Sequence, residues 1–459
     1  MKKYIILLLT SVSSLINAQI ICADGGNSIV CANGNVMTAG DNESGQLGNN
    51  TNTSSNYPVQ VSGLTNIIAV GGGNNHRLAI KSDGTVWAWG DNYSGALGDG
   101  TNNDSNIPVA VSLLTNVTAI SAGGGNFSLA LKNDGTVWSW GSNYKGQLGV
   151  GTTLNTNIPT KIPWLSGIVK ISAGGDHSMA LKNDGTVWTW GYNQHGQLGN
   201  GLMMPNSIGI GLDSNIPVQV SGISNIISIS AGHLMSYALR DDGKVFSWGQ
   251  NVYGQLGDGT TTRAHTPVLL SLSNVQAIEA GGSHCLFLLD NSNLMSVGQN
   301  VNGQLGNGTT TPFSTPNSSP IQVNSISGVT EISAGGGTSI AKKSDGSIWM
   351  WGDNSDGRFG NGTTTNSSIP VQITTFCAVQ GIDENKNESS IVAYPNPTYD
   401  ILYMNVKNAK SVIITNVFGN IIYSNLEPQS KISIDISNLP NGVYFIQMEN
   451  MNAIKFVKQ

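Results

Sequence analysis

Residues 138–152 read WSWGSNYKGQLGVGT, and the chain repeats this arrangement seven times. The glycine that ends the tryptophan-bearing segment recurs at Gly40, Gly90, Gly141, Gly191, Gly249, Gly298 and Gly352. Each of these glycines is followed by Asn-x-x-Gly-x-[Leu/Phe]-Gly, which we call the frame. The interval between successive glycines is 49 to 58 residues. A repeat near 50 residues is typical of a solenoid, a propeller or an array.

The third repeat shows four strand-like segments within one period. Apolar or alternating residues occupy Val117–Ser121, Ser128–Lys132, Thr136–Trp140 and Ile158–Lys161. The second and third segments are joined by Asn-Asp-Gly at 133–135, which is typical of a tight hairpin. Four short strands in about 50 residues, repeated along the chain, predict the blade of a β-propeller.

The tryptophan-bearing strand indicates how the sheets pack. In VWSWG, Trp138 and Trp140 share one face, and the small Ser139 lies on the other. Nine of the ten tryptophans occupy this strand, so the pattern holds in most repeats. A strand with a bulky face and a small face, and no charged side, is expected between two like sheets. We therefore predict an all-β fold, a seven-bladed β-propeller, in which tryptophans of one blade pack on the next.

Composition excludes several classes of function. The chain has 459 residues, a net charge of −6 and only 10% charged residues, with no basic cluster beyond the N-terminus. We therefore expect no nucleic-acid partner. Four cysteines in so long a chain make no disulfide framework. Cys22 and Cys31 flank one predicted hairpin and are the pair most suited to a disulfide, Cys285 fits a buried strand, and Cys377 is left open.

The two ends of the chain differ from the repeats. Residues 1–18 combine Lys2 and Lys3, a short apolar run and Ala18, which is the pattern of a signal peptide. The apolar run is too short to span a membrane, although an N-terminal anchor is the alternative. The repeats fill residues 19–376, and a polar linker follows at 377–390. Residues 391–459 alternate β-branched residues with turn formers, which predicts a small Ig-like β-sandwich.

The repeats and the C-terminal segment each resemble a known family. The DGxVWxWG strand and NxxGQLG frame over residues 19–376 are similar to the repeats of the regulator of chromosome condensation family. That resemblance implies a seven-bladed propeller; a kelch propeller has a comparable period but different motifs. Residues 391–459 resemble the C-terminal sorting domain of the type IX secretion system of Bacteroidetes, on YPNP at 394–397, Gly442-Val443-Tyr444 and the basic end at 455–458. The second resemblance implies export to the cell surface or the medium through the type IX machinery; a plain accessory β-domain is the alternative.

We expect the ring to close through its ends. The repeats finish on an outer strand, Val371–Thr374, and the mature chain begins on a strand at Gln19–Cys22. Because an open ring would leave sheet edges exposed, we predict that these two segments pair.

No catalytic, metal or cofactor site is predicted. His76, His177 and His284 recur at one position of their repeats, where other repeats have Phe127 and Met235. Such residues on separate blades do not converge on one ion, so we expect structural histidines bonded to the backbone. The loop at 353–357 lacks the spaced carboxylates of a calcium site. No nucleophile, base or phosphate loop is signalled, and we expect no enzyme activity.

A binding surface is predicted on the frames. The two middle residues of each frame differ from repeat to repeat while the surrounding residues recur, as expected of a rigid scaffold that presents variable side chains. Tyrosine and methionine are favoured contact residues. The predicted ligand-binding residues are Tyr93, Tyr144, His195 and Tyr253, with Met203 and Met204 from the long fourth repeat.

These observations favour a secreted or surface-displayed, non-catalytic propeller that binds a protein or glycan, with adhesion as one such role. A secreted enzyme inhibitor is the alternative, because some bacterial propellers that resemble this family inhibit β-lactamases. Guanine-nucleotide exchange follows only from the name of the family. An enzyme that uses the propeller as a scaffold is a fourth hypothesis.

Overall fold

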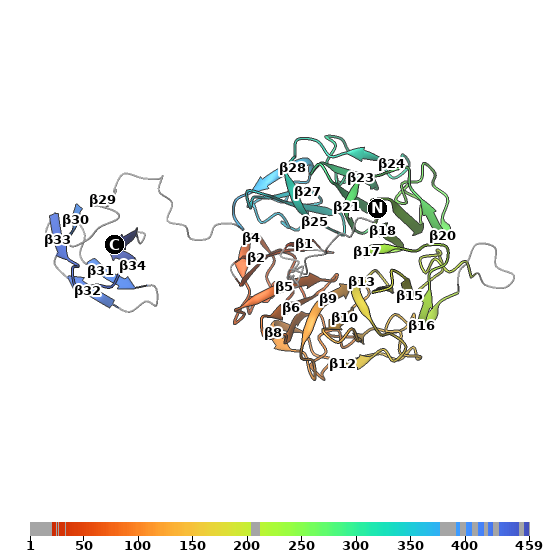
Figure 1. Cartoon of the computed structure of the whole chain (residues 1–459), viewed down its shortest axis with the longest axis horizontal. Coiled ribbons are helices and arrows are strands. Elements are labelled where there is room, and N and C mark those ends of the chain that lie inside the picture. Colours follow the sequence, from red (N-terminus) through yellow and green to blue (C-terminus); the bar gives the residue numbers. More distant parts are fainter. Residues whose placement is uncertain are drawn as a thin grey trace, which may run out of the picture. The chain divides into compact units, whose positions relative to one another are not determined.

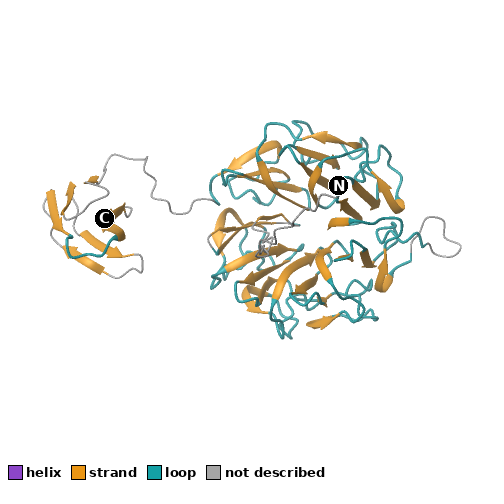
Figure 2. Ribbon diagram, viewed as in Figure 1, coloured by secondary structure: helices purple, strands orange, loops and turns teal. Residues whose placement is uncertain are grey.

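A computed structural model describes most of the chain. It covers residues 21–202 apart from 24, 26 and 33, residues 212–376, and in the tail 392–394, 401–405, 412–416, 421–425, 431–448 and 454–458. The predicted signal peptide therefore lies outside the described residues. The chain divides into two compact units, Met1–Cys377 and Ala378–Gln459. Regular structure within the described ranges is β-strand throughout (Figure 2), and no helix there is long and apolar enough to cross a membrane.

Seven four-stranded antiparallel sheets make up the described part of the first unit, each from four consecutive strands. The strands, sheet by sheet, are β1 (Ile21–Ala23), β2 (Asn27–Ala32), β3 (Asn35–Gly40), β4 (Ser55–Gln60); β5 (Ile67–Gly72), β6 (His76–Lys81), β7 (Val86–Gly90), β8 (Ser105–Ala110); β9 (Val117–Gly123), β10 (Phe127–Lys132), β11 (Val137–Gly141), β12 (Thr156–Lys161); β13 (Ile168–Ala173), β14 (His177–Lys182), β15 (Val187–Gly191), β16 (Ser214–Gln219); β17 (Ile226–Ala231), β18 (Met235–Arg240), β19 (Val245–Gly249), β20 (Ala264–Leu269); β21 (Val275–Ala280), β22 (His284–Leu289), β23 (Leu294–Gly298), β24 (Asn317–Gln322); β25 (Val329–Gly335), β26 (Thr338–Lys343), β27 (Ile348–Gly352) and β28 (Ser367–Ile373).

The sheets surround a common axis (Figure 1), with the first strand of each sheet innermost. In the third sheet, β9 pairs with β10, β10 with β11 and β11 with β12. Gly135 ends the hairpin between β10 and β11 with φ of 76°, a conformation that glycine adopts without steric cost. The four strands expected from the third repeat are thus confirmed. The other six sheets are also built from four consecutive strands.

Each outermost strand carries a proline at the same place, which suits its position at a sheet edge. The seven are Pro58, Pro108, Pro159, Pro217, Pro267, Pro320 and Pro370. Proline has no N–H to donate, so it blocks the pairing of another strand along this edge. The rim of the ring is therefore protected against edge-to-edge association.

Tryptophans join neighbouring sheets as the alternation predicts. Trp140 is fully buried and packs among Leu78, Ile80 and Ala88 of the preceding sheet. Ser139, on the opposite face of the same strand, is also fully buried. Five tryptophans occupy this fully buried position: Trp89, Trp140, Trp190, Trp248 and Trp351. The predicted contact of a bulky face with the small face of its neighbour is the main packing interaction of the ring.

Closure of the ring differs from the prediction. β28 (Ser367–Ile373), which contains Val371, pairs with β27 of its own sheet, and β1 pairs with β2. The expected pairing of 371–374 with 19–22 is therefore wrong. The first repeat already supplies four strands, because its innermost strand begins at Ile21, so no strand is left to exchange between the ends.

The ring instead closes by packing, as between any two neighbouring sheets. Ile21 and Ala23 pack with Ile348 and Met350 of the last sheet. The backbone N–H of Ala23 donates to Ser333 Oγ at 3.0 Å. The same kind of bond joins other neighbours, for example Ala173 N to Ser121 Oγ at 2.9 Å.

The tail unit contains two antiparallel sheets in the residues described. One has the order β29 (Val392–Tyr394), β30 (Ile401–Asn405), β33 (Lys431–Asp435); the other has β32 (Ile421–Asn425), β31 (Val412–Asn416), β34 (Gly442–Met448), β35 (Ile454–Lys458). Leu402, Ile414, Ile434 and Ile446 are buried, whereas Asp435 is exposed, which is the alternation of strands with one buried face.

Candidate binding face

The connections between strands lie at two ends of the ring. Phe127, at the start of β10, pairs with Gly123 of β9 and Gly141 of β11, so the glycine-rich turn and the frame share one end. We call this end the frame face. The hairpins between second and third strands, such as residues 133–135, share the opposite end, which we call the hairpin face. The four predicted binding residues that the structure describes, Tyr93, Tyr144, His195 and Tyr253, lie on the frame face.

The constant residues of each frame are used structurally. In the third frame, Asn143 Nδ2 donates to the carbonyls of Thr152 (2.9 Å) and Leu154 (3.0 Å). Its Oδ1 accepts the backbone N–H of Leu148 at 3.0 Å, and Leu148 is fully buried. One buried amide therefore ties both ends of the loop together. The recurrence of the motif reflects loop closure and needs no ligand to explain it.

The variable pair in the middle of the frame lies outside this network. Tyr93 is 80% exposed and Tyr144 is 69% exposed, on adjacent frames. Lys145, beside Tyr144, places Nζ 5.0 Å from the ring centre of Tyr192, which directly precedes the next frame. The rigid part of the loop thus presents the first variable side chain, Tyr93 or Tyr144, to solvent in the second and third frames, whereas Ser94 is buried and Lys145 is half-buried.

The other predicted site residues are less accessible. His195 is half-buried and packs edge-on against Tyr192, with ring centres 6.0 Å apart. Tyr253 is half-buried with its ring 5.7 Å from that of Phe313. Met203 and Met204 fall outside the described residues. The structure therefore distributes the four described residues over four consecutive frames on one face and does not gather them into one pocket.

Glycine-rich turns form the inner part of the frame face. Gly124 N donates to Gly174 O at 3.0 Å and Gly125 N donates to Gly175 O at 2.7 Å, so turns of neighbouring sheets bond directly. A Cβ added at Gly125 would lie 2.1 Å from Asp176 Oδ1 and 2.7 Å from Gly175 O. Close approach of two backbones, and not a phosphate loop, is the reason for glycine here.

A cavity of about 540 Å³ lies at the axis on the frame face. All seven sheets contribute to it through the ends of their innermost strands. Small Ala and Gly residues make up most of the wall. The polar side chains that line it are Asp41, Asn74, Asn75, His233, Ser283, Gln299 and Asp356. The volume is within the range of ligand sites in proteins.

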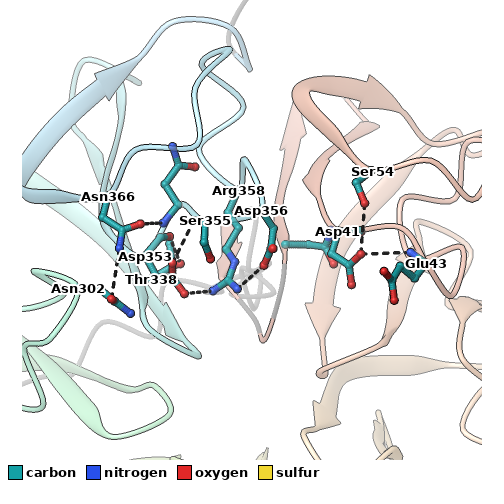
Figure 3. A network of polar contacts seen from close by, with 12 residues as sticks. Asp41, Glu43, Ser54, Asn302, Thr338, Asp353, Ser355, Asp356, Arg358 and Asn366 are labelled. Carbon is teal, nitrogen blue, oxygen red and sulfur yellow. Dashed lines mark hydrogen bonds and ion pairs between the residues drawn. The ribbon is translucent and has the colours of Figure 1, made fainter. Parts of the chain in front are cut away.

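Arg358 organises the polar network beside this cavity (Figure 3). It is 7% exposed, and its two terminal nitrogens bind Asp353 Oδ2 at 2.9 Å and Asp356 Oδ2 at 2.6 Å. Across the junction with the first sheet, Asp41 accepts Gln46 Nε2 at 2.8 Å and Ser54 Oγ at 3.3 Å. Asp41 and Asp356 are not among the binding residues predicted from the sequence. The available signal was Arg358, which stands where most frames have glutamine.

The recurrent histidines are structural, but their partner differs from the expectation. Nε2 of His76, His177 and His284 each lies 2.9 Å from a serine Oγ of the following sheet. Burial lowers the pKa of His76 and His177 to about 3 and that of His284 to about 4, so all three are neutral. They join side chains of adjacent sheets, whereas only bonds to backbone were predicted; His76 has such a backbone bond as well, with Phe127. Among the described residues, no group of three or more metal-ligating side chains is placed to hold an ion.

Below the cavity, serines bridge the innermost strands. Ser121, Ser172, Ser230 and Ser333 each accept a backbone N–H of the next sheet at 2.9–3.0 Å. The corresponding residue of the sixth sheet is Glu279. Burial raises the pKa of Glu279 to about 7; the nearby Lys170 charge opposes this shift and the Glu331 charge adds to it.

The cysteine predictions are tested in part. Cys285 is fully buried in β22, as expected. Cys22 is also buried and is paired in register with Ile29, two residues before Cys31. The side chain of Cys31 and residue Cys377 lie outside the described residues, so the proposed disulfide stays a prediction.

Comparison with known proteins agrees with this architecture. The model of the RCC1-like domain matches residues 35–388. The chain belongs to the RCC1-like domain family. Residues 392–459 match the secretion system C-terminal sorting domain, so the tail is a type IX sorting domain and supports secretion or display at the cell surface.

The curated relatives align with only part of this chain, and they are much longer than it. Human HERC2, an E3 ubiquitin-protein ligase, is 32% identical over 31% of this chain and 3% of its own length. Human HERC6, a probable E3 ubiquitin-protein ligase, is 35% identical over 53% of this chain and 24% of its own length. The chain thus spans under a quarter of these relatives. Yeast RCC1 (Prp20), solved bound to Kap60, aligns with a TM-score of 0.66 and 22% identity, covering 81% of this chain and 91% of that one, which shows the fold alone.

Proposed function

We propose that this RCC1-like protein is an exported, non-catalytic binding propeller that holds a protein or glycan ligand on its frame face. In this proposal the seven sheets are blades of one closed propeller, and the two tail sheets form an immunoglobulin-like sandwich. Residues 1–18 act as the signal for export from the cytoplasm, and the type IX machinery recognises the tail.

The observation that supports binding is that the constant and the variable residues of a frame have different roles. The recurrent asparagine and leucine are buried and hold the loop closed, whereas Tyr93 and Tyr144 are 80% and 69% exposed. Exposed tyrosines on a rigid loop provide large contact area at small entropic cost, as in interface hot spots. A solved relative, yeast RCC1, binds another protein, which is compatible with a protein ligand here.

A capture experiment with the full chain tests this proposal. Purified protein is presented to a glycan array and to proteins of the culture medium, beside the variant Tyr93→Ala/Tyr144→Ala/Tyr253→Ala. We expect saturable binding that the variant lowers at least tenfold, because hot-spot aromatics carry 2 kcal/mol or more. Leu113→Ala, which removes a side chain 77% exposed in the connection between β8 and β9 on the hairpin face, is the matched control.

The nature of the captured ligand separates the alternatives. A secreted hydrolase that loses activity on binding would make this protein an inhibitor. Binding that is equal for the wild type and the tyrosine variant would contradict the proposed face. Turnover of a bound ligand would contradict the non-catalytic assignment.

A further inference from the structure

Charge is distributed unequally over the two faces of the ring. In the loops of the frame face that the structure describes, ten residues are acidic: Asp41, Glu43, Asp91, Asp99, Asp104, Asp176, Asp213, Asp258, Asp353 and Asp356. Three residues there are basic: Lys145, Arg263 and Arg358. The face as a whole therefore has a negative potential, which attracts cations at a distance.

The hairpin face is balanced by contrast. Its hairpin acids follow a lysine or arginine by two residues in five of the repeats, and three of these pairs are closed in the structure. Lys182 Nζ lies 3.3 Å from Asp184, and Arg240 binds Asp242 at 2.7 Å. Lys343 lies 3.9 Å from Asp345. The acidic excess of the frame face is thus not a general property of this protein's loops.

The axial cavity lies within this acidic face and carries two of its carboxylates. Asp41 and Asp356 both line the cavity, from the first and last sheets. The Asp41 carboxylate is held by neutral donors, an amide and a hydroxyl, so its charge is not neutralised by those contacts. Asp356 shares Arg358 with Asp353, which leaves one negative charge for this group of three. A cationic group in the cavity would find two uncompensated charges beside it.

We propose that the axial cavity receives a lysine or arginine side chain of a protein partner, with the cation beside Asp41 and Asp356. This inference deepens the proposed function and rests on it. It favours a protein over a neutral glycan, because sugar hydroxyls can donate hydrogen bonds to the two carboxylates but cannot neutralise their charge. The exposed Tyr93 and Tyr144 on the same face would contact the surface around the inserted side chain.

Oligolysine tests the inference on the full chain. The probe is fluorescein-labelled decalysine in 50 mM NaCl, with Nε-acetylated decalysine and decaglutamate as controls for charge. We expect saturable binding of decalysine alone, weakened by added salt because the charges involved are accessible to screening. Equal binding of the acetylated peptide, or no binding of decalysine, would overturn the inference.

Matched variants locate the site. Asp41→Asn/Asp356→Asn keeps the shape of both side chains and removes their charge, and we expect it to weaken decalysine binding at least tenfold. Asp134→Asn/Asp184→Asn makes the same change on the hairpin face and should change binding less than twofold. Thermal unfolding of each variant establishes that it is folded; unchanged affinity in the folded Asp41/Asp356 variant would overturn the inference.

Failure of this inference is distinguishable from failure of the proposed function. A captured ligand that needs Tyr93, Tyr144 and Tyr253 but not Asp41 and Asp356 keeps the binding face and removes the cation site. Oligolysine binding that depends on Asp41 and Asp356, with no effect of the tyrosine variant, keeps the cavity and contradicts the tyrosine surface.

Discussion

The indole Nε1 of Trp140 donates a hydrogen bond to the carbonyl oxygen of Ala96 at 2.8 Å, across the boundary between the third and second sheets. The same carbonyl accepts Ser128 Oγ at 2.9 Å, and Ser128 Oγ lies 2.9 Å from His76 Nε2. A frame carbonyl of one sheet therefore fixes two side chains of the next. This relation makes the frame part of the joint between sheets as well as a loop on the surface.

Replacing this tryptophan tests the joint. Trp140→Phe removes the bond to Ala96 and part of a fully buried side chain. We expect a loss of about 2 kcal/mol in the free energy of unfolding, measured by urea titration. Trp138→Phe is the control, because Trp138 is only half-buried and bonds its neighbour Thr136 at 3.3 Å. An equal loss in both variants would contradict a special role for the inter-sheet bond.

The frame asparagine should be equally important for its loop. Asn143→Ala removes both donors to the backbone carbonyls and the acceptor for Leu148. Because one buried backbone N–H and two partly buried carbonyls lose their partner, we expect a loss of about 2 kcal/mol by urea titration. Asn103→Ala, at an exposed residue of the second frame loop, should cost less than 0.5 kcal/mol. A loss below 1 kcal/mol for Asn143→Ala would mean that the loop closes without it.

Acid should destabilise the ring through the buried histidines. Burial lowers the pKa of His177 to about 3 from 6.5, so the unfolded chain binds the proton more readily between these values. The stabilisation by the neutral histidine is complete above pH 6.5 and is lost as pH falls toward 3. At pH 5 the loss in the free energy of unfolding is about 2 kcal/mol for one histidine.

The chain itself offers the variant that tests this pH dependence. Met235 occupies the place of His177 in the next sheet, so His177→Met is compatible with the fold. We expect its free energy of unfolding to fall less between pH 7 and pH 5 than that of wild type. Parallel pH profiles of the two proteins would show that His177 is not responsible.

The repeat and its packing could be predicted from sequence because each signal is local and occurs many times. The alternation of Trp138, Ser139 and Trp140 indicates which face of the strand is bulky. Because the same strand recurs in each repeat, the sheet of the neighbouring repeat is the expected packing partner. Ring closure could not be predicted in this way, because it depends on where the first repeat begins. Exposure of Tyr93 and Tyr144 followed from their variable positions in a constant loop. The cavity site at Asp41 and Asp356 could not be predicted, although Asp356 is also a variable frame residue, since only the circular arrangement brings the first and last frames to one cavity.

The second sheet has a glycine at the position where four other sheets have a serine that bonds the next sheet, and a serine can be introduced there. Gly71 occupies the position of Ser121, and a Cβ there would lie 3.8 Å from Ile120, in ordinary contact. Gly71→Ser would place a hydroxyl to accept the backbone N–H of Ala122, as Ser121 does for Ala173. The lower entropy of the unfolded chain adds to this bond, so we expect a gain of about 1 kcal/mol in thermal or urea unfolding. Gly71→Ala separates the two contributions, and a destabilised serine variant would contradict the bridging geometry.

Glu279 should make the ring less stable as the pH rises from 4.5 through 7. Its pKa is raised to about 7 from 4.5, so the folded protein holds a proton that the unfolded chain has released between these values. The stabilisation by the protonated form is complete below pH 4.5 and is lost as pH rises through 7. Glu279→Ser introduces the residue found at this position in four other sheets and removes a half-buried carboxylate. We expect the variant to be about 2 kcal/mol more stable than wild type at pH 8, because the partial exposure of Glu279 to solvent reduces the effect of the pKa shift, and equal to it near pH 4.5. Urea titrations at the two pH values measure this difference; a gain of the same size at both would show that the serine bond, and not the carboxylate charge, determines the effect.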